Sequence, residues 1–268
     1  MREQGMKTNN LTVLFATDQG YVPHLATAIF SLLENNKKLK INIVVFTSKI
    51  KPDDQKKLEE ISNLFKTHIK FEFLDDNLFD GLILNHHFHK SNYYRLFAAD
   101  LIDADKCLYL DVDLIVTGSL DGLLEIDLGE HFLAAVEDPV FNRHKKLGMK
   151  LNSKYFNSGV MLINLRKWRE ADVRSAVIDF VKARANVIEF VDQCGLNGVV
   201  DGNWLELNCT FNFQNSMMPN GPAMGQNTIK NYKIVHFTGS SKPWQMHNKH
   251  SHKHIYWKYR KNALQNYL

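Results

Sequence analysis

Residues 11–47 read LTVLFATDQGYVPHLATAIFSLLENNKKLKINIVVFT, and their pattern decides the fold class. The apolar run at 11–17 is short and contains β-branched residues, and the turn-prone DQG after it marks the end of a buried strand. Apolar residues then recur at helical spacing from Val22 to Leu33, before a second β-branched run at 41–47. This order predicts a strand, a helix and a second strand, the unit from which parallel sheets are built.

The same alternation continues along the chain and predicts a mostly parallel sheet with helices on both faces. A helix is expected at 52–65, where Pro52 stands at the helix start, and a strand at 69–74. Further elements are expected as strands at 108–112, 131–136, 159–164 and 234–237 and as a helix at 172–184. In such sheets, binding sites lie at the carboxyl ends of the strands.

Composition is that of an ordinary globular protein. The 268 residues are 44% hydrophobic and 23% charged, and the 33 basic residues exceed the 29 acidic ones by four, so bulk charge does not indicate a nucleic acid partner. Three widely spaced cysteines, Cys107, Cys194 and Cys209, favour reduced core thiols over a disulfide framework or a zinc site, and hence a cytosolic protein. No apolar run reaches the roughly 18 residues of a membrane span, and the start does not have the form of a signal peptide.

Two aspartates, Asp111 and Asp113, interrupt the apolar stretch CLYLDVDLIVTGSL at 107–120. A buried carboxylate is costly without a compensating cation, and two neighbouring carboxylates also repel each other, so positive groups are expected opposite them. Residues two apart on a strand face the same side, and a divalent cation bound to phosphate oxygens suits such a pair. An ordinary strand end followed by a turn is the alternative for the pair taken alone.

The same stretch also resembles the first motif of haloacid-dehalogenase-like phosphatases, in which Asp111 would be the nucleophile and Asp113 a general acid. That motif usually opens a chain, whereas here a long α/β segment precedes it. Ile115 stands where the motif usually has Thr or Val, and no acidic pair follows in a suitable context. The phosphatase is kept as an alternative function.

Six segments together resemble, in order, the blocks of glycosyltransferase family 8, which includes bacterial lipopolysaccharide glucosyl- and galactosyltransferases, glycogenin and galactinol synthase. They are ATDQGYVPHLATAIFSL, NYYRLFAADLI, LYLDVDLIVTGSL, YFNSGVMLINLRKWRE, DQCGLNGVV and IVHFTGSSKPW, and they cover roughly residues 11–245. The resemblance implies a GT-A fold, a single Rossmann-like nucleotide-sugar-binding α/β domain with a mixed, mostly parallel central sheet. It also implies transfer of glucose or galactose from a UDP-sugar with retention of configuration, using Mn²⁺, with Mg²⁺ as the alternative.

The resemblance assigns the uridine pocket to the end of the first strand, at Ala16, Asp18 and Tyr21. The aspartate can accept from the uracil ring N–H, and the tyrosine supplies an aromatic face. A loop cap is the alternative role for Asp18. Gln19 and Gly20 replace an acid and an asparagine that are frequent in the family.

The resemblance assigns metal binding to Asp111, Asp113 and His236, with diphosphate oxygens completing the shell. An imidazole ligand favours Mn²⁺ over Mg²⁺, which prefers oxygen ligands alone. Gly239 and Lys242 match residues that contact the departing diphosphate, whose growing charge the metal and the ammonium would stabilise.

Four further residues match the part of the family site that holds the sugar. Arg95 matches an arginine that reaches the donor, and Asn157, Asp192 and Gln193 match residues that hold sugar hydroxyls and line the face of the anomeric carbon. Because the family lacks the carboxylate pair of retaining glycosidases, Asp192 and Gln193 are assigned the catalytic positions, with Gln193 positioning the sugar and stabilising cationic charge. A helix cap is the alternative role for Asp192.

We therefore expect a cytoplasmic hexosyltransferase domain at 11–245 that acts on a saccharide or glycolipid acceptor of lipopolysaccharide type. A catalytically silent nucleotide-sugar-binding protein is a further alternative. The Gly-, Pro- and Asn-rich segment 214–228 is expected to cover the site. Residues 246–268 form a basic tail that also contains Ile255, Tyr256, Trp257 and Tyr259. This composition is suited either to peripheral contact with an anionic inner membrane face or to a terminal helix packed on the domain.

Overall fold

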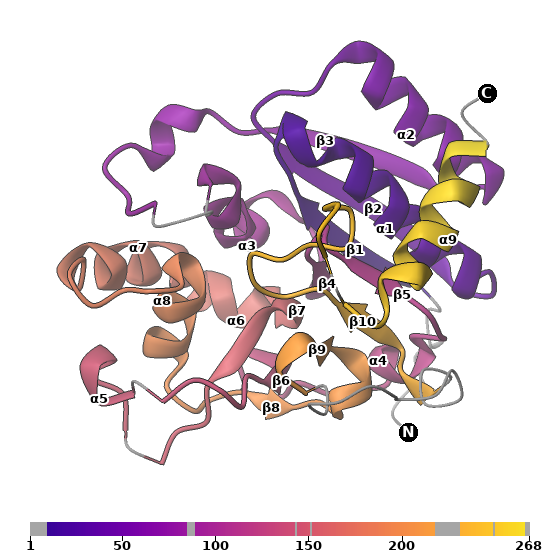
Figure 1. Ribbon diagram of the computed structural model, residues 1–268. Coiled ribbons are helices and arrows are strands. Elements are labelled where there is room, and N and C mark those ends of the chain that lie inside the picture. The colour runs from indigo at the N-terminus through magenta and orange to yellow at the C-terminus, as the bar shows by residue number, and fades with distance from the viewer. Residues whose placement is uncertain are drawn as a thin grey trace, which may run out of the picture.

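The computed structural model describes residues 10–84, 89–142, 144–150, 152–217, 231–248 and 250–265. A seven-stranded sheet has the order β3-β2-β1-β4-β7-β6-β8, and a second sheet has the order β5-β10-β9 (Figure 1). The strands are β1 (Asn10–Ala16), β2 (Lys40–Thr47), β3 (His68–Phe73), β4 (Lys106–Leu110), β5 (Leu114–Val116), β6 (Leu133–Glu137), β7 (Phe156–Asn164), β8 (Leu205–Glu206), β9 (Phe213–Gln214) and β10 (Ile234–His236).

Helices surround these sheets (Figure 1). The α-helices are α1 (Val22–Asn35), α2 (Pro52–Leu64), α3 (Ala98–Leu101), α4 (Asp121–Leu124), α5 (His144–Leu147), α6 (Leu165–Glu170), α7 (Val173–Ala183), α8 (Val191–Val200) and α9 (Lys253–Gln265). Short 3-10 helices are η1 (Gln19–Tyr21), η2 (Asp76–Phe79), η3 (Lys90–Phe97), η4 (Cys209–Phe211) and η5 (Asn215–Met217).

The large sheet is mixed and mostly parallel, which confirms the predicted fold class. Strand β1 pairs in parallel with β2 and β4, and β2 pairs in parallel with β3. Strand β7 is antiparallel to both β4 and β6, and β6 pairs in parallel with β8. The helix between β1 and β2 supplies the crossover that parallel neighbours need.

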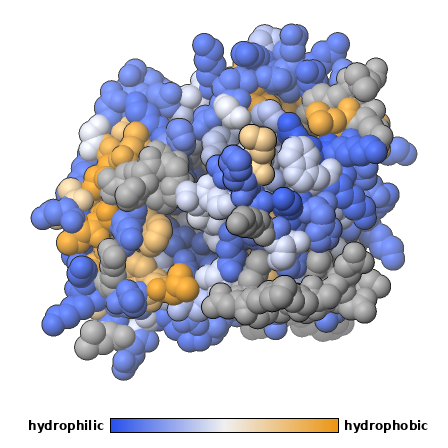
Figure 2. Space-filling view, in the orientation of Figure 1, coloured by the Kyte–Doolittle hydropathy of each residue, from blue (hydrophilic) through white to orange (hydrophobic). Residues whose placement is uncertain are grey.

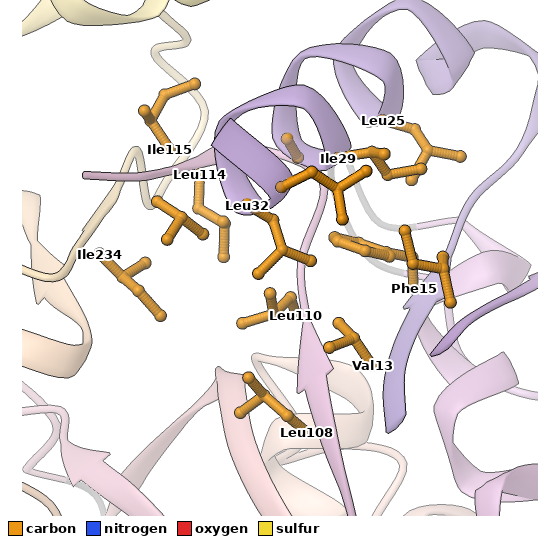
Figure 3. Close-up of a cluster of buried hydrophobic side chains, with 14 of the residues drawn as sticks. Val13, Phe15, Leu25, Ile29, Leu32, Leu108, Leu110, Leu114, Ile115 and Ile234 are labelled. Carbon is orange, nitrogen blue, oxygen red and sulfur yellow. The ribbon is translucent and has the colours of Figure 1, made fainter. Parts of the chain in front are cut away.

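Successive side chains of a strand point to opposite faces of the large sheet, so the core is divided into one cluster on each face. Val13 and Phe15 of β1 belong to one cluster with residues of α1, α2, α9, β5 and β10 (Figure 3). Leu14 and Ala16 belong to a second cluster with residues of η3, α3, α6, α7 and α8. Because both faces are covered, the strands read as continuous apolar runs, as parallel strands with two buried faces do.

The expected strand at 108–112 ends earlier than the sequence suggested. Strand β4 stops at Leu110, and β5 begins at Leu114 in the other sheet, where it pairs with β10. Asp111 and Asp113 therefore lie in the bend between two sheets and not on a regular strand. The chain changes sheets here because β5 finds its partner in the distant segment Ile234–His236, which the local apolar pattern cannot reveal.

Helix α9 packs on the domain beside α1 (Figure 1). Ile255, Tyr256, Tyr259 and Ala263 are buried in the same cluster as β1 and α1. Of the four side chains that the membrane alternative would place at a lipid surface, three are thus core residues, Ile255, Tyr256 and Tyr259, whereas Trp257 is 47% exposed. Of the two alternatives for the tail, the structure therefore shows the terminal helix packed on the domain. The domain boundary after residue 245 stays a prediction.

The surface and the cysteines concern two further predictions, the lack of a membrane span and the state of the thiols. The face seen in Figure 2 is mostly hydrophilic, and most of its hydrophobic residues lie on the side where α7 lies. Within the described ranges, no helix has the length and apolarity to span a bilayer. All three cysteines are free thiols, Cys107 and Cys194 in the core as expected, but Cys209 exposed.

Candidate functional site

A cavity of about 440 Å³ opens at the carboxyl ends of β1 and β4, where parallel sheets hold their ligands. Its volume lies in the ordinary range for small-molecule sites. All twelve residues predicted for the site line this cavity: Ala16, Asp18, Tyr21, Arg95, Asp111, Asp113, Asn157, Asp192, Gln193, His236, Gly239 and Lys242. Gln214, Asn215 and Ser216 also line it, and the rest of the expected covering segment from 218 to 228 lies outside the described residues.

Asp111, Asp113 and His236 form one group whose potential ligand atoms all lie within 4.8 Å of one another. His236 Nε2 lies 3.1 Å from Asp113 Oδ1 and 3.6 Å from Asp111 Oδ2. Two carboxylates and an imidazole nitrogen are a donor set suited to Mn²⁺ or a similar divalent ion.

Backbone hydrogen bonds explain how the bend holds the two aspartates toward the histidine. The Asp111 N–H donates to the Gly159 carbonyl (2.8 Å) on β7, and the Asp113 carbonyl accepts from the Phe237 N–H (3.0 Å) after β10. The bend is thus tied to one strand of each sheet. The antiparallel register of β10 with β5 pairs His236 with Leu114, next to Asp113.

Asp111 and His236 leave no room for a side chain at Gly159 on β7. A Cβ on residue 159 would lie 2.2 Å from His236 Cε1 and 2.6 Å from Asp111 Oδ2. Any side chain here would displace two of the three donor groups, so only glycine fits on β7 behind the site. Together with the donor set, this cradle fits a bound divalent ion.

Two buried cations face the aspartates, as the burial argument predicted. Arg95 NH2 lies 2.9 Å from Asp111 Oδ1, and the Arg95 side chain is only 3% exposed. Lys242 Nζ forms an ion pair with Asp113 and donates to the Phe237 carbonyl (2.8 Å). Each carboxylate therefore has its own counter-ion, and the two need not share one compensating charge.

The surrounding groups alter the pKa values of the site. Burial acts to raise the pKa of Asp113, but the Lys242 ammonium and the His236 ring outweigh burial and hold that pKa well below its usual range. Burial acts to lower the pKa of Arg95, but Asp111 and Asp192 raise it, so the guanidinium stays charged. Asp113 is therefore ionised and ready to bind a cation at neutral pH.

Asp192 is the second residue of α8 and does not cap that helix, whose N-cap is Phe190. Its Oδ2 lies 3.2 Å from Arg95 Nε, but that N–H points at the Asn92 carbonyl (3.0 Å), and Oδ2 has no hydrogen bond to the described residues. Burial raises the pKa of Asp192 to about 6, although Arg95 acts in the opposite direction. Asp192 is thus an ion-paired acid with an acceptor atom to spare.

Asn157 and Gln193 lie side by side in the wall of the cavity. Gln193 Oε1 accepts from Asn157 Nδ2 (3.2 Å) and from the Ser158 backbone N–H (3.0 Å). Gln193 Nε2 lies 3.4 Å from Asp138 Oδ2, whose pKa burial raises. Hydrogen bonds thus fix both amides, which the resemblance assigns to binding of the sugar.

Asp18 has the cap role that was its alternative assignment, and it also lines the cavity. Its Oδ1 caps η1 by accepting from the N–H groups of Gly20 (2.8 Å) and Tyr21 (3.3 Å). Its Oδ2 lies 3.4 Å from Ser91 Oγ, and the residue lines the cavity. Gln19 instead turns toward α2, where it donates to Asp54 (2.7 Å).

The polar residues that the sequence did not reveal include Tyr109, Asp138 and Asn212. Tyr109 donates to Asp111 Oδ1 (2.6 Å), and its ring lies 4.2 Å from the Arg95 guanidinium carbon. Asp138 lines the cavity beside Gln193, and Asn212 contacts His236 from behind. Tyr109 could have been found, because it stands two residues before Asp111, whereas Asp138 and Asn212 have no local signal.

Comparison with known structures defines the class of fold. The solved structure of the galactosyltransferase LgtC in complex with donor and acceptor sugar analogues matches with a TM-score of 0.85 and 28% identity, over 94% of this chain and 96% of LgtC. LgtC is a GT-A glycosyltransferase, so the predicted GT-A fold is confirmed.

Sequence comparison then defines the family. The model of Glycosyl transferase family 8 matches residues 12–248, and the chain therefore belongs to glycosyltransferase family 8. General stress protein A of Bacillus subtilis is 31% identical over 268 residues, covering 94% of each chain. The lipopolysaccharide 1,2-glucosyltransferase of Escherichia coli is 25% identical over 248 residues, covering 87% of this chain and 72% of its own.

Family membership makes the chain a glycosyltransferase and displaces the phosphatase alternative. GT-A glycosyltransferases commonly use a divalent metal, and the group Asp111, Asp113 and His236 is suited to hold one.

Proposed function

We propose that this glycosyltransferase moves a hexose, glucose or galactose, from a UDP-sugar to a saccharide or glycolipid acceptor with retention of configuration, and that it uses Mn²⁺. The observation that carries the proposal is the convergence of Asp111, Asp113 and His236 in a cavity that also holds Lys242. A diphosphate, a divalent ion and an ammonium group belong together in the breaking of a glycosyl phosphate bond. The LgtC complex with donor and acceptor analogues supports the same reaction class.

The residues divide between binding and bond cleavage. Ala16, Asp18 and Tyr21 would hold the uridine, and Gly239 and Lys242 would contact the diphosphate. Gly239 adopts a positive φ of 79°, which lets its backbone turn at the cavity edge at no steric cost. Asp111, Asp113 and His236 would hold the divalent ion, which when bound would offset the charge that builds on the departing diphosphate.

The sugar side of the cavity is polar and buried. Asn157 and Gln193 are 7% and 9% exposed, and Asp192 is 2% exposed. Such groups can hold sugar hydroxyls and stabilise the positive charge that develops at the anomeric carbon. Hydrogen bonds from Asn157 and from the Ser158 N–H of β7 hold Gln193 in place, so this amide needs little reorganisation during the reaction.

A catalytically silent nucleotide-sugar-binding protein is the remaining alternative, and thermal stabilisation by UDP tests it. We expect UDP to raise the melting temperature only with Mn²⁺ present, because ligand bound to the native state stabilises it. UDP–Mn²⁺ stabilisation without turnover of any sugar donor would favour the silent binder. No effect of UDP with Mn²⁺ would contradict the proposed site.

Gln193→Ala and Lys242→Ala should separate the two sides of the cavity. Gln193→Ala should lower kcat more than it weakens UDP binding, because its proposed contacts are to the hexose and strengthen in the transition state. Lys242→Ala should weaken UDP binding as well. Calorimetry with UDP and Mn²⁺, with Gln55→Ala on α2 as the control outside the cavity, measures the difference. Equal losses of UDP affinity in the two variants would contradict these assignments.

The proposed glycolipid acceptor connects to a peripheral membrane contact through the outer face of α9. Lys253, His254, Trp257, Lys258, Lys261 and Leu264 are its exposed residues, and within helical geometry they share one side of the helix. Met246 nearby is 87% exposed. Lysines beside a tryptophan, with no acid between them, suit an anionic lipid surface.

Lys258→Gln together with Lys261→Gln should lower sedimentation with phosphatidylglycerol-containing vesicles at low salt, because each basic residue contributes about 1 kcal/mol near such a surface. Added salt should have the same effect on the wild-type protein. The pair Lys56→Gln and Lys66→Gln removes the same charge elsewhere. Equal sedimentation of the two double variants would argue against membrane contact through α9.

A further inference from the structure

A chain of buried side-chain amides joins the two halves of the site. His236 Nδ1 lies 2.9 Å from Asn212 Oδ1, and Asn212 Nδ2 lies 2.9 Å from Asn157 Oδ1. Asn157 Nδ2 in turn lies 3.2 Å from Gln193 Oε1. The chain therefore runs from the proposed metal ligand to the proposed sugar-binding amides, and Asn212 at its centre is fully buried at 0% exposure.

Two backbone N–H groups, which can only donate, set the direction of every hydrogen bond in this chain. The Gly159 N–H donates to Asn157 Oδ1 (3.0 Å), so that atom is the acceptor, and Asn212 must present its NH₂ group to it. Asn212 then presents its oxygen to His236, and Nδ1 of the ring must carry the proton. The Ser158 N–H likewise fixes Gln193 Oε1 as an acceptor (3.0 Å).

The consequence for His236 is a defined tautomer. Because Nδ1 donates to Asn212, Nε2 is the nitrogen left for a metal ion, and it lies 3.1 Å from Asp113 Oδ1 and 3.6 Å from Asp111 Oδ2. A metal ion bound there would take the place of the proton that Nε2 shares with Asp113. An imidazole can ligate a metal only through an unprotonated nitrogen, and a hydrogen-bonded partner on the other nitrogen holds the ring in place. Asn212 has both effects.

We propose that Asn212 is a positioning residue: it holds His236 in the tautomer that can bind a metal ion, and it fixes Asn157 on the sugar side through the same amide. Asn212 follows η4 and precedes β9, which pairs in parallel with β10 at Gln214 and His236. The small sheet thus holds the amide beside the ring. This inference rests on the proposed metal site, and its test separates the two.

The test measures Mn²⁺ binding without donor, by the electron paramagnetic resonance signal of free Mn²⁺, together with transfer activity. Asn212→Ala removes both hydrogen bonds and should raise the Mn²⁺ dissociation constant about 10- to 100-fold, the usual effect of losing such a partner. Asn208→Ala, an exposed cap of η4 in the same segment, should bind Mn²⁺ as the wild type does.

Asn212→Asp distinguishes positioning from simple structural support. Its carboxylate still accepts from His236 Nδ1, so Mn²⁺ affinity should be retained, but it cannot donate to Asn157, so turnover should fall. Unchanged Mn²⁺ affinity in Asn212→Ala, or wild-type turnover in Asn212→Asp, would overturn the proposal. If Asn212→Ala does not fold, loss of Mn²⁺ affinity in folded Asn212→Asp would overturn it. Wild-type protein that binds no Mn²⁺ would instead contradict the metal site itself.

Discussion

Asp113→Asn is expected to abolish transfer while leaving the fold intact, and Asp111→Asn should behave in the same way. Each variant removes a charged ligand from the group Asp111, Asp113 and His236 but keeps the size of the side chain. The loss should exceed the ~10- to 100-fold that removal of an outer hydrogen-bond partner usually costs, because a ligand itself is lost. The measurement is the initial rate of transfer at saturating Mn²⁺.

The control for these variants is Asp121→Asn, an exposed acid on α4 outside the cavity. Near-wild-type turnover of either ligand variant would contradict the metal site. On the sequence alone, replacing either aspartate by asparagine was expected to relieve the repulsion between Asp111 and Asp113. Because Lys242 and Arg95 each pair with one of the two carboxylates, we now expect no gain in stability.

Arg95→Met is expected to have the largest effect on stability. Arg95 lies 2.9 Å from Asp111 and 3.2 Å from Asp192, and the Asp192 side chain is only 3% exposed. Breaking a buried ion pair from one side typically costs about 3–5 kcal/mol, because the remaining charge is left unpaired in a low-dielectric site. The free energy of unfolding in urea measures this loss.

Two companion variants make the Arg95 experiment specific. Arg174→Met removes an exposed ion pair with Asp100, about a third exposed on each side, and should cost at most about 1 kcal/mol. Asp192→Asn in the Arg95→Met background should recover part of the lost stability, since it removes an unpaired carboxylate. An Arg95→Met protein as stable as Arg174→Met would show that the buried pair is not what supports this region.

Local patterns predicted the elements of the fold well, because each element is decided by nearby residues. The strand, helix and strand of 11–47 appear as β1, α1 and β2 with only small differences at their ends. The twelve residues that the resemblance assigned to the site all line one cavity, and this cavity lies at the carboxyl ends of β1 and β4, as expected for a parallel sheet. The positive groups opposite the aspartates also followed from the cost of burying charge.

Long-range pairing explains what the sequence did not reveal. The stretch LDVDLIV appears as one strand, and only the pairing of β5 with β10 divides it. Asn212 stands among ordinary residues, and its importance appears only when β9 carries it beside His236. In α9, composition left both a membrane surface and a packed helix open, although Ile255, Tyr259 and Ala263 recur at the spacing of a packed helix face.

The central claim is Mn²⁺-dependent cleavage of a UDP-hexose by this site, and release of UDP from a panel of UDP-sugars tests it most directly. We predict release from UDP-glucose or UDP-galactose with Mn²⁺, increased by a saccharide acceptor, and its loss with a chelator or in Asp113→Asn. Protein that binds UDP with Mn²⁺ but releases it from no UDP-sugar, or that keeps its full rate in Asp113→Asn, would contradict the account.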